Sequence, residues 1–115
     1  MTDLVTLNVH TEPSGTVVVA AIGELDLSNS EQLDAALANL DTVPRVVVDL
    51  SLCTFFDSSC LGVLSRHAMR FSEEGRAFSV RVDAQGRRVI ELTSLDVLLG
   101  LDSPDAELQE RAAQS

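Results

Sequence analysis

Hydrophobic runs along the chain predict a set of strands separated by polar segments. Residues 4–9 and 16–22 are rich in Val, Leu and Ile, and the turn-forming sequence EPSG lies between them, so a hairpin is expected. The run VVVDL at 46–50 has no alternation, which is typical of a strand buried on both faces. A loop is expected over 51–57. Hydrophobic and polar residues alternate over 78–82, which predicts a further strand.

In two stretches between these strands, hydrophobic residues recur at the three- and four-residue spacing of an α-helix. The first helix is expected to begin near Ser28 or Asn29, in a capping box with the glutamate or glutamine three residues later. The second is expected to follow the loop and to stop at Gly75, a typical residue just past a helix end. The apolar stripes are Leu33, Ala36, Leu37 and Leu40 in the first helix, and Leu61, Leu64, Ala68 and Phe71 in the second.

The remaining segment predicts shorter elements. Asp83 is a candidate cap for a short third helix that ends near Leu95, and residues 97–99 are expected to form a short strand. A Ser-Pro pair predicts a terminal helix over 104–113. Because a helix connects the strands at 46–50 and 78–82, these two are expected to pair in parallel. The sequence therefore predicts one α/β domain over residues 1–115.

Composition narrows the classes of function. The 115 residues are 45% hydrophobic, enough for one core, and the formal net charge is -10. All basic residues are Arg. This acidic balance argues against direct nucleic-acid binding, because phosphate backbones require a basic surface. The sequence shows neither a secretory signal nor a long apolar span, and its two cysteines make no disulfide framework, so a cytoplasmic protein without a membrane span is expected.

Segment 55–62 combines two features of ligand sites in α/β proteins. It follows the most hydrophobic strand and it begins a helix, where anions are favoured. Its adjacent hydroxyls, Ser58 and Ser59, are either helix caps or a phosphorylation site. Cys60 lies in the first helical turn and is either a buried, inert thiol or a reactive thiol whose pKa the helix lowers.

Other arrangements do not fit catalysis or metal binding. A triad of Ser58, His67 and Asp49 fails because the helix separates the serine and the histidine by roughly 13 Å along its axis. His67 is expected at the surface or its boundary, and His10 in a strand without a special role. The cysteines and histidines lack metal-ligand spacing, so neither a metal nor a cofactor is expected. A phospho-accepting role for Asp49, as in receiver domains, is disfavoured because the chain has no Lys.

Three motifs, in this order, resemble the STAS family, and more narrowly its bacterial anti-sigma-factor antagonists. They are GELD at 23–26 followed by a capped helix, VVVDLS at 46–51, and FDSS-x-LGVL at 56–64. The resemblance covers about residues 4–101. It implies a mixed sheet of four to five strands with the helices packed mainly on one side.

The resemblance also implies a regulatory switch and not an enzyme. In such proteins the serine after the motif aspartate, here Ser58, is phosphorylated by an anti-sigma factor that is itself an ATP-dependent serine kinase. The unphosphorylated form binds that kinase and releases the sigma factor, and a metal-dependent PP2C-type phosphatase resets the switch. The expected partner-binding residues are Asp26, Asp57, Ser58, Ser59 and Leu61.

Electrostatics explains how such a switch would operate. A phosphate on Ser58 adds about -1.5 to -2 charges at a helix amino terminus, which tolerates them. These charges fall beside Asp57 and, in the family arrangement, near Asp26. A partner that accepts these carboxylates would then meet repulsion, so we expect an electrostatic block and no large conformational change.

Two positions depart from the family pattern, and two alternative functions stay open. Cys60 stands where the family usually has Gly, and DAQG replaces the usual Ser-Pro start of the third helix. Gly86 in that start is expected to weaken the helix by roughly 1 kcal/mol relative to Ala. One alternative is a non-switching STAS scaffold or cytoplasmic accessory of a membrane transporter. The other is a redox switch through Cys53 and Cys60, with or without a disulfide between them.

Overall fold

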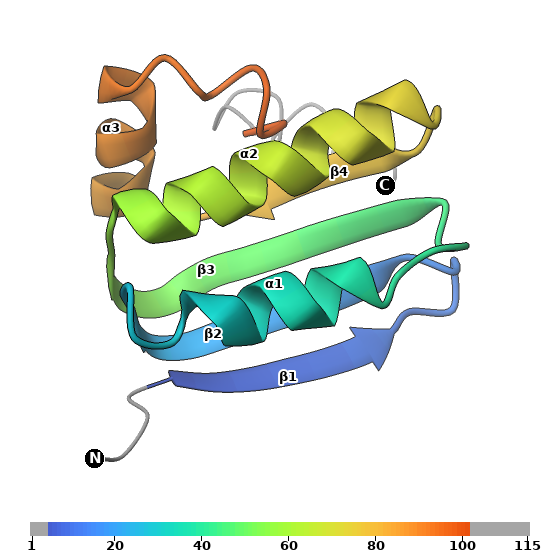
Figure 1. The fold of residues 1–115 in the computed structure, drawn as a ribbon, viewed down its shortest axis with the longest axis horizontal. Coiled ribbons are helices and arrows are strands. Elements are labelled where there is room, and N and C mark those ends of the chain that lie inside the picture. Colours follow the sequence, from blue (N-terminus) through green and yellow to red (C-terminus); the bar gives the residue numbers. More distant parts are fainter. Residues whose placement is uncertain (1–4, 102–115) are drawn as a thin grey trace, which may run out of the picture.

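The computed structural model describes residues 5–101, which form a four-stranded mixed sheet covered by helices. The strands lie in the order in which they follow one another in the sequence, β1-β2-β3-β4 (Figure 1). β1 pairs antiparallel with β2, while the β2–β3 and β3–β4 pairs are parallel. The predicted hairpin and parallel pairing are therefore confirmed. The strands are β1 (Val5–Thr11), β2 (Val17–Leu25), β3 (Arg45–Phe56) and β4 (Ala77–Arg81).

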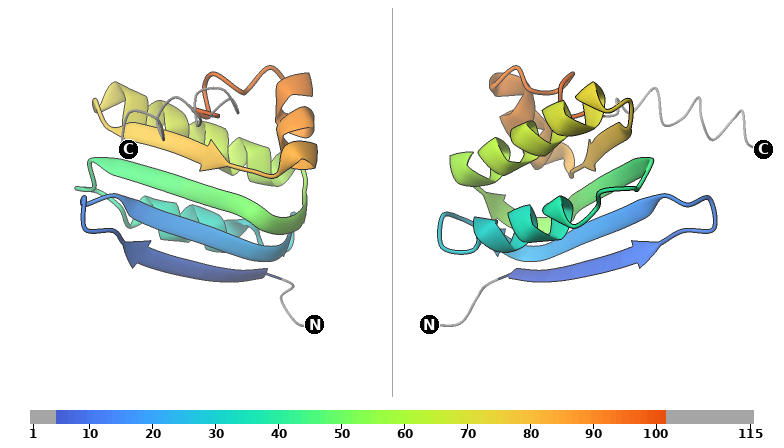
Figure 2. Two further views of the ribbon diagram at one scale, coloured as in Figure 1. Left: turned by 180° about the vertical axis from the view of Figure 1, so that it is seen from behind. Right: turned by 45° about the vertical axis from the view of Figure 1, so that its right-hand side comes forward.

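Two helices lie side by side across one face of this sheet, as both views of Figure 2 show. They are α1 (Ser30–Ala38), which connects β2 to β3, and α2 (Ser58–Glu73), which connects β3 to β4. A third helix, α3 (Ala84–Leu92), follows β4 at the end of the sheet where α2 begins. The mixed sheet with helices mainly on one side agrees with the predicted fold class.

The core forms between the sheet and these two helices. The stripe predicted for α2 is fully confirmed, since all four of its residues are buried. Of the stripe predicted for the first helix, only Leu33 and Leu37 are buried, while Ala36 and Leu40 are half-buried and pack against the core. β3 contributes an almost continuous buried run, as its lack of alternation predicted. The fully buried side chains of greatest volume are Phe71, Leu25, Leu33, Leu37, Leu50, Leu64, Ile90, Leu99, Val19, Val46, Val48 and Val80.

β3 is longer than predicted, and the loop expected over 51–57 is wrong. The strand continues to Phe56, and the pairing with β2 continues with it through Ile22–Leu52 and Leu25–Phe56. Two register shifts interrupt this pairing, one after Ala20 and one after Gly23. A bulge breaks the alternation of inward and outward side chains, so the sequence pattern no longer reads as a strand although the hydrogen bonding persists.

Residues 97–99 form turns and not the predicted strand. The amide of Leu99 donates to the carbonyl of Leu95 (2.9 Å), and the side chain of Leu99 is completely buried. A Cβ on Gly100, whose φ is +62°, would lie 2.4 Å from the carbonyl oxygen of Phe78. This segment thus packs directly on β4 and is held by side-chain burial, which produces the same hydrophobic signal as a strand. α3 correspondingly ends before Leu95, and the predicted helix over 104–113 lies outside the described residues.

The predicted capping box of α1 is wrong, whereas the predicted end of α2 is confirmed. Asn29 precedes α1, but its side chain makes no cap; it accepts from the amide of Asp26 and donates to the carbonyl of Glu24 (both 2.9 Å). The amide side chain therefore organises the turn before the helix. At the end of α2, Gly75 has φ +71° and the amide of Arg76 donates to the carbonyl of Phe71 (2.8 Å), a Schellman arrangement.

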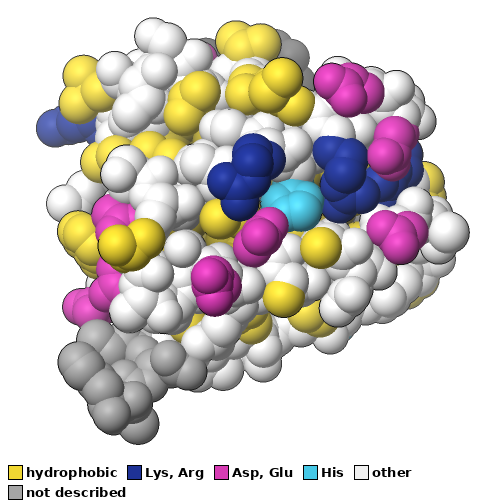
Figure 3. All heavy atoms as spheres, in the orientation of Figure 1, with side chains coloured by type: hydrophobic (Ala, Val, Ile, Leu, Met, Phe, Trp, Pro, Cys, Tyr) yellow, Lys and Arg dark blue, Asp and Glu magenta, His cyan; other side chains and the backbone are white. Residues whose placement is uncertain are grey.

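His67 is buried, whereas we expected it at the surface or its boundary. Its Nε2 lies 2.6 Å from a carboxylate oxygen of Asp34 on α1, and its Nδ1 lies 3.2 Å from the guanidinium of Arg70. A guanidinium only donates, so Nδ1 accepts and Nε2–H donates to the carboxylate. Arg70 also donates to the carbonyl of Leu37 (3.0 Å). The histidine thus belongs to a polar link between the two helices, and Figure 3 shows basic, acidic and His side chains gathered on the helix face.

Candidate functional site

The carboxyl ends of β2 and β3 bring two acidic turns together. Leu25 pairs with Phe56 at the last position of the two strands, and the amide of Asp57 donates to the carbonyl of Leu25 (3.2 Å). Asp26 directly follows Leu25 and Asp57 directly follows Phe56, so the turns after these two strands lie side by side. The carboxylate of Asp26 accepts from the amide and the hydroxyl of Ser28. The structure therefore supports the expected neighbourhood of the two aspartates.

Asp57 is the amino-terminal cap of α2. It has extended backbone, and its Oδ1 accepts from the amides of Ser59 (3.0 Å) and Cys60 (3.3 Å). The hydroxyl of Ser59 donates to the same oxygen, and this bond, with the backbone amides of Cys60, Ser59 and Leu27, lowers the pKa of Asp57 below its usual 3.8. The carboxylate is therefore ionised at neutral pH. The cap that we considered for the serine pair belongs to this aspartate instead.

The two serines differ in their surroundings. Ser58 is the first residue of α2 and is exposed, and its hydroxyl makes no hydrogen bond within residues 5–101. Ser59 is half-buried and its hydroxyl is bound to the cap carboxylate. Only Ser58 thus presents a free hydroxyl to solvent at this helix start.

Hydrophobic side chains surround the acidic turns. Leu27, beside Asp26, is 79% exposed, and Phe55, at the end of β3, is 51% exposed. Figure 3 shows hydrophobic and acidic side chains next to one another at this end of the molecule. Sequence reasoning did not single out Leu27, although a Leu between two polar turn residues was a usable signal. By contrast, Leu61, which we expected to bind a partner, is only 9% exposed and belongs to the core.

Both cysteines are buried free thiols. Cys60 is completely buried, and desolvation, followed by the charges of Cys53 and Asp57, raises its pKa to about 12. The expected alternative, in which the helix lowers this pKa, is therefore wrong: burial outweighs the helix field. Burial also raises the pKa of Cys53, although hydrogen bonds to the backbone of Phe55 and Leu25 oppose the shift. Cys60, which stands where the family usually has Gly, therefore fills the core.

Alkylation tests this assignment of the thiols. We expect native protein at pH 8 to react with a maleimide at least about a hundredfold more slowly than protein unfolded in urea, because buried thiols are protonated and shielded. Mass spectrometry of timed samples measures both rates, and Cys60→Ala separates the two sites. Rapid labelling of Cys60 in folded protein would contradict the burial and revive the redox switch.

Two further observations concern ligands and membranes. Within residues 5–101 no group of three or more His, Cys, Asp or Glu side chains is arranged to hold a metal ion. Over the same described range, no helix is long and apolar enough to cross a membrane.

Comparison with known proteins agrees with this geometry. A family model described as "Mlab, STAS domain" matches residues 9–101. No curated protein matches the chain. Among solved structures, the chain is similar to an anti-sigma factor antagonist from Mycobacterium paratuberculosis, with 29% identity, a TM-score of 0.78 and 92% coverage of each chain.

Two other solved structures share the fold. An antisigma-factor antagonist STAS domain from Rhodobacter sphaeroides is 25% identical with a TM-score of 0.57, over 72% of this chain and 89% of that one. The Bacillus cell fate determinant SpoIIAA, in its phosphorylated form, is 21% identical with a TM-score of 0.62, over 91% of this chain and 98% of that one. Since the family model spans most of the sequence, the chain belongs to the STAS domain family.

Proposed function

We propose that this protein is an anti-sigma-factor antagonist controlled by phosphorylation of Ser58. The unphosphorylated form binds an anti-sigma factor that is a serine kinase, and this binding releases the sigma factor. The phosphorylated form does not bind, and a PP2C-type phosphatase restores the active form. In this scheme the protein is a substrate and a binding partner, with no turnover of its own.

The free hydroxyl of Ser58 is the observation that carries this proposal. It is exposed at the start of α2, directly beside the ionised cap Asp57. The turn of Asp26 is held next to it through the bond between Asp57 and Leu25. A phosphate there adds charge to a surface that already holds carboxylates, while the fold beneath it keeps its contacts.

The comparisons support the same scheme. The similar proteins from Mycobacterium paratuberculosis and Rhodobacter sphaeroides are described as anti-sigma-factor antagonists, and SpoIIAA of Bacillus exists in both unphosphorylated and phosphorylated forms. A scaffold that does not switch would share the fold, so the phosphate itself must be located.

Ser58, and not Ser59, is expected to take the phosphate, because the hydroxyl of Ser59 is bound to Asp57. Trypsin cuts after Arg45 and Arg66, so residues 46–66 leave as one peptide with both serines. After incubation with ATP and each anti-sigma kinase of the same genome, fragmentation of this peptide should place one phosphate on Ser58.

Matched variants make the test decisive. Ser59→Ala should keep the modification, and Ser58→Ala should abolish it. Phosphate on Ser59 would move the site by one residue. No phosphate with any kinase would favour the scaffold alternative and would contradict the proposal.

A further inference from the structure

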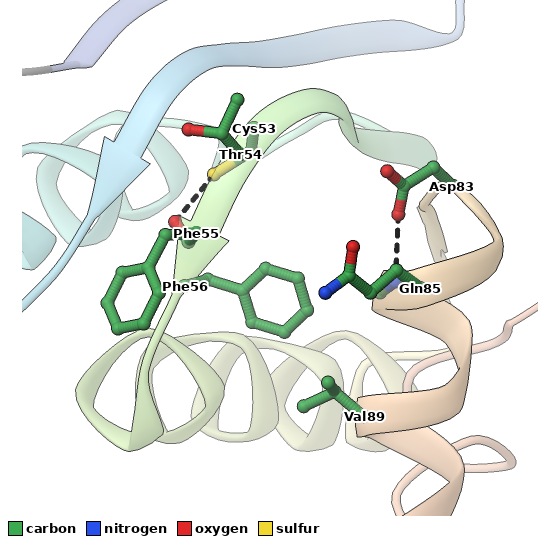
Figure 4. A pocket seen from close by; sticks show the side chains of 8 residues that line it. Cys53, Thr54, Phe55, Phe56, Asp83, Gln85 and Val89 are labelled. Atoms are coloured by element: carbon green, nitrogen blue, oxygen red, sulfur yellow. Dashed lines mark hydrogen bonds between the residues drawn. The ribbon is translucent and has the colours of Figure 1, made fainter.

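A cavity of about 250 Å³ opens between the end of β3 and the first turn of α3 (Figure 4). Phe56, which lines it, directly precedes Asp57, so the cavity adjoins the proposed phosphorylation site. The other half of its wall comes from the amino-terminal part of α3. The lining residues are Cys53, Thr54, Phe55, Phe56, Asp83, Gln85, Gly86 and Val89.

Gly86 lets the first turn of α3 pack closely against the end of β3. A Cβ at this position would lie 3.2 Å from Cε1 of Phe56 and 3.1 Å from Cβ of Val82. The backbone of α3 therefore approaches the phenyl ring so closely that a larger residue would require the ring or Val82 to shift. From the sequence, Gly86 was expected only to weaken α3. In the structure it also allows the start of α3 to pack against β3.

The walls of the cavity combine aromatic and acidic groups. Phe55 and Val89 expose 51% and 40% of their surface, and the ring of Phe56 faces the cavity in Figure 4. One carboxylate oxygen of Asp83 accepts from the amide of Gly86 (2.8 Å), and the other makes no hydrogen bond among the described residues. The side-chain amide of Gln85 also points into this space.

The charged groups at the cavity are acidic. Among the residues that the structure describes, no basic side chain lines it, and Arg87 and Arg88 of α3 are not part of its wall. Glu24 of β2 pairs with Phe55, which brings a second carboxylate to its margin. The negative charges of Asp83 and Glu24 both contribute to the raised pKa of Cys53, which lines the cavity, so both carboxylates lie close enough to influence groups in its wall.

We propose that this cavity receives an arginine side chain of the anti-sigma factor. A guanidinium fits both features of the wall, because it stacks on aromatic faces and binds carboxylates through several N–H donors. Its aliphatic stem would cover Val89 and Phe55. An anion is disfavoured, since the carboxylate of Asp83 already accepts from the amide of Gly86 and would repel a second negative charge. This inference rests on the proposed function for the identity of the partner.

Asp83→Asn tests the charge without removing the cap, because asparagine is an equally good amino-terminal cap. We expect this variant to bind the anti-sigma factor about tenfold more weakly, with the difference shrinking at high salt. Asp41→Asn is the matched control, since Asp41 is exposed in the turn between α1 and β3. Binding by Asp83→Asn that equals wild type would overturn the inference.

A double-mutant cycle identifies the partner residue. Each arginine and each lysine of the anti-sigma factor is replaced by alanine and measured against wild type and Asp83→Asn. One arginine should lose most of its effect in the Asp83→Asn background. Coupling to a lysine, or to no basic residue, would overturn the assignment.

A partner-free measurement separates this inference from the proposed function. N-acetyl-arginine amide, titrated into ¹⁵N-labelled protein, should shift the amides of Cys53, Phe56 and Gly86 saturably. The neutral isostere N-acetyl-citrulline amide should shift them much less, and Asp83→Asn should remove the difference. Equal shifts with both probes, or none, would overturn the cavity's role even if the anti-sigma factor binds. Selective arginine binding without any anti-sigma factor binding would instead refute the proposed function.

Discussion

Ser58→Asp is expected to weaken binding to the anti-sigma factor by more than about a hundredfold, a loss of about 3 kcal/mol. The new carboxylate lies beside the ionised Asp57 and adjacent to the turn of Asp26. A partner surface that binds these groups would meet added repulsion and would have to desolvate a further charge. Isothermal titration calorimetry with the purified anti-sigma factor measures the effect.

Ser58→Asn separates charge from size, because asparagine has the shape of aspartate without its charge. We expect this variant to bind within a few-fold of wild type and Ser58→Asp to regain part of its affinity as salt rises. Both variants should unfold at the same urea concentration as wild type, since residue 58 is exposed at a helix start that tolerates negative charge. If Ser58→Asn binds as weakly as Ser58→Asp, the block is steric.

Phe71→Ala is expected to lower the free energy of unfolding by about 3–5 kcal/mol. The ring is completely buried and packs edge-to-face on Phe78, with 5.6 Å between ring centroids. The guanidinium of Arg76 lies 3.9 Å from the Phe71 centroid and also donates to the carbonyl of Val43 (3.0 Å). The substitution therefore leaves a cavity where α2, β4 and the turn before β3 meet.

Urea unfolding followed by circular dichroism measures this loss. Met69→Ala is the matched control on the same helix, because Met69 is 52% exposed. Its effect should stay within about 0.5 kcal/mol. A domain of this size is stable by about 5–15 kcal/mol, so Phe71→Ala should remove much of the margin. An unfolding midpoint equal to that of Met69→Ala would contradict this account of the core.

The elements with a clean hydrophobic period could be predicted from the sequence, and those shaped by tertiary contacts could not. The stripe of α2 and its stop at Gly75 follow from local spacing and from one residue that tolerates positive φ. The second half of β3 could not be predicted in this way. Bulges interrupt the alternation of inward and outward side chains there, although the pairing with β2 continues. Leu99 shows the converse: burial against β4 gives a strand-like signal to a turn.

The part of the candidate site whose residues are adjacent in the sequence could be predicted. The DSS motif places an aspartate, a helix start and two hydroxyls together, and the structure distinguishes the hydroxyls through the bond from Ser59 to Asp57. The sequence could not show that His67 is buried, because its partner Asp34 lies on another helix. Nor could it show the cavity at Gly86, which depends on how closely α3 approaches Phe56.

The cap of α2 has a consequence for the lifetime of the phosphorylated state. Asp57 already accepts from the amides of Ser59 and Cys60, the groups that a phosphoryl group at a helix start would otherwise recruit. A phosphoryl group on Ser58, as proposed, would therefore find these two amides already occupied and would stay hydrated. In the proposed scheme the duration of the phosphorylated state would therefore be set by how fast a phosphatase binds, and not by a structural element that must first open.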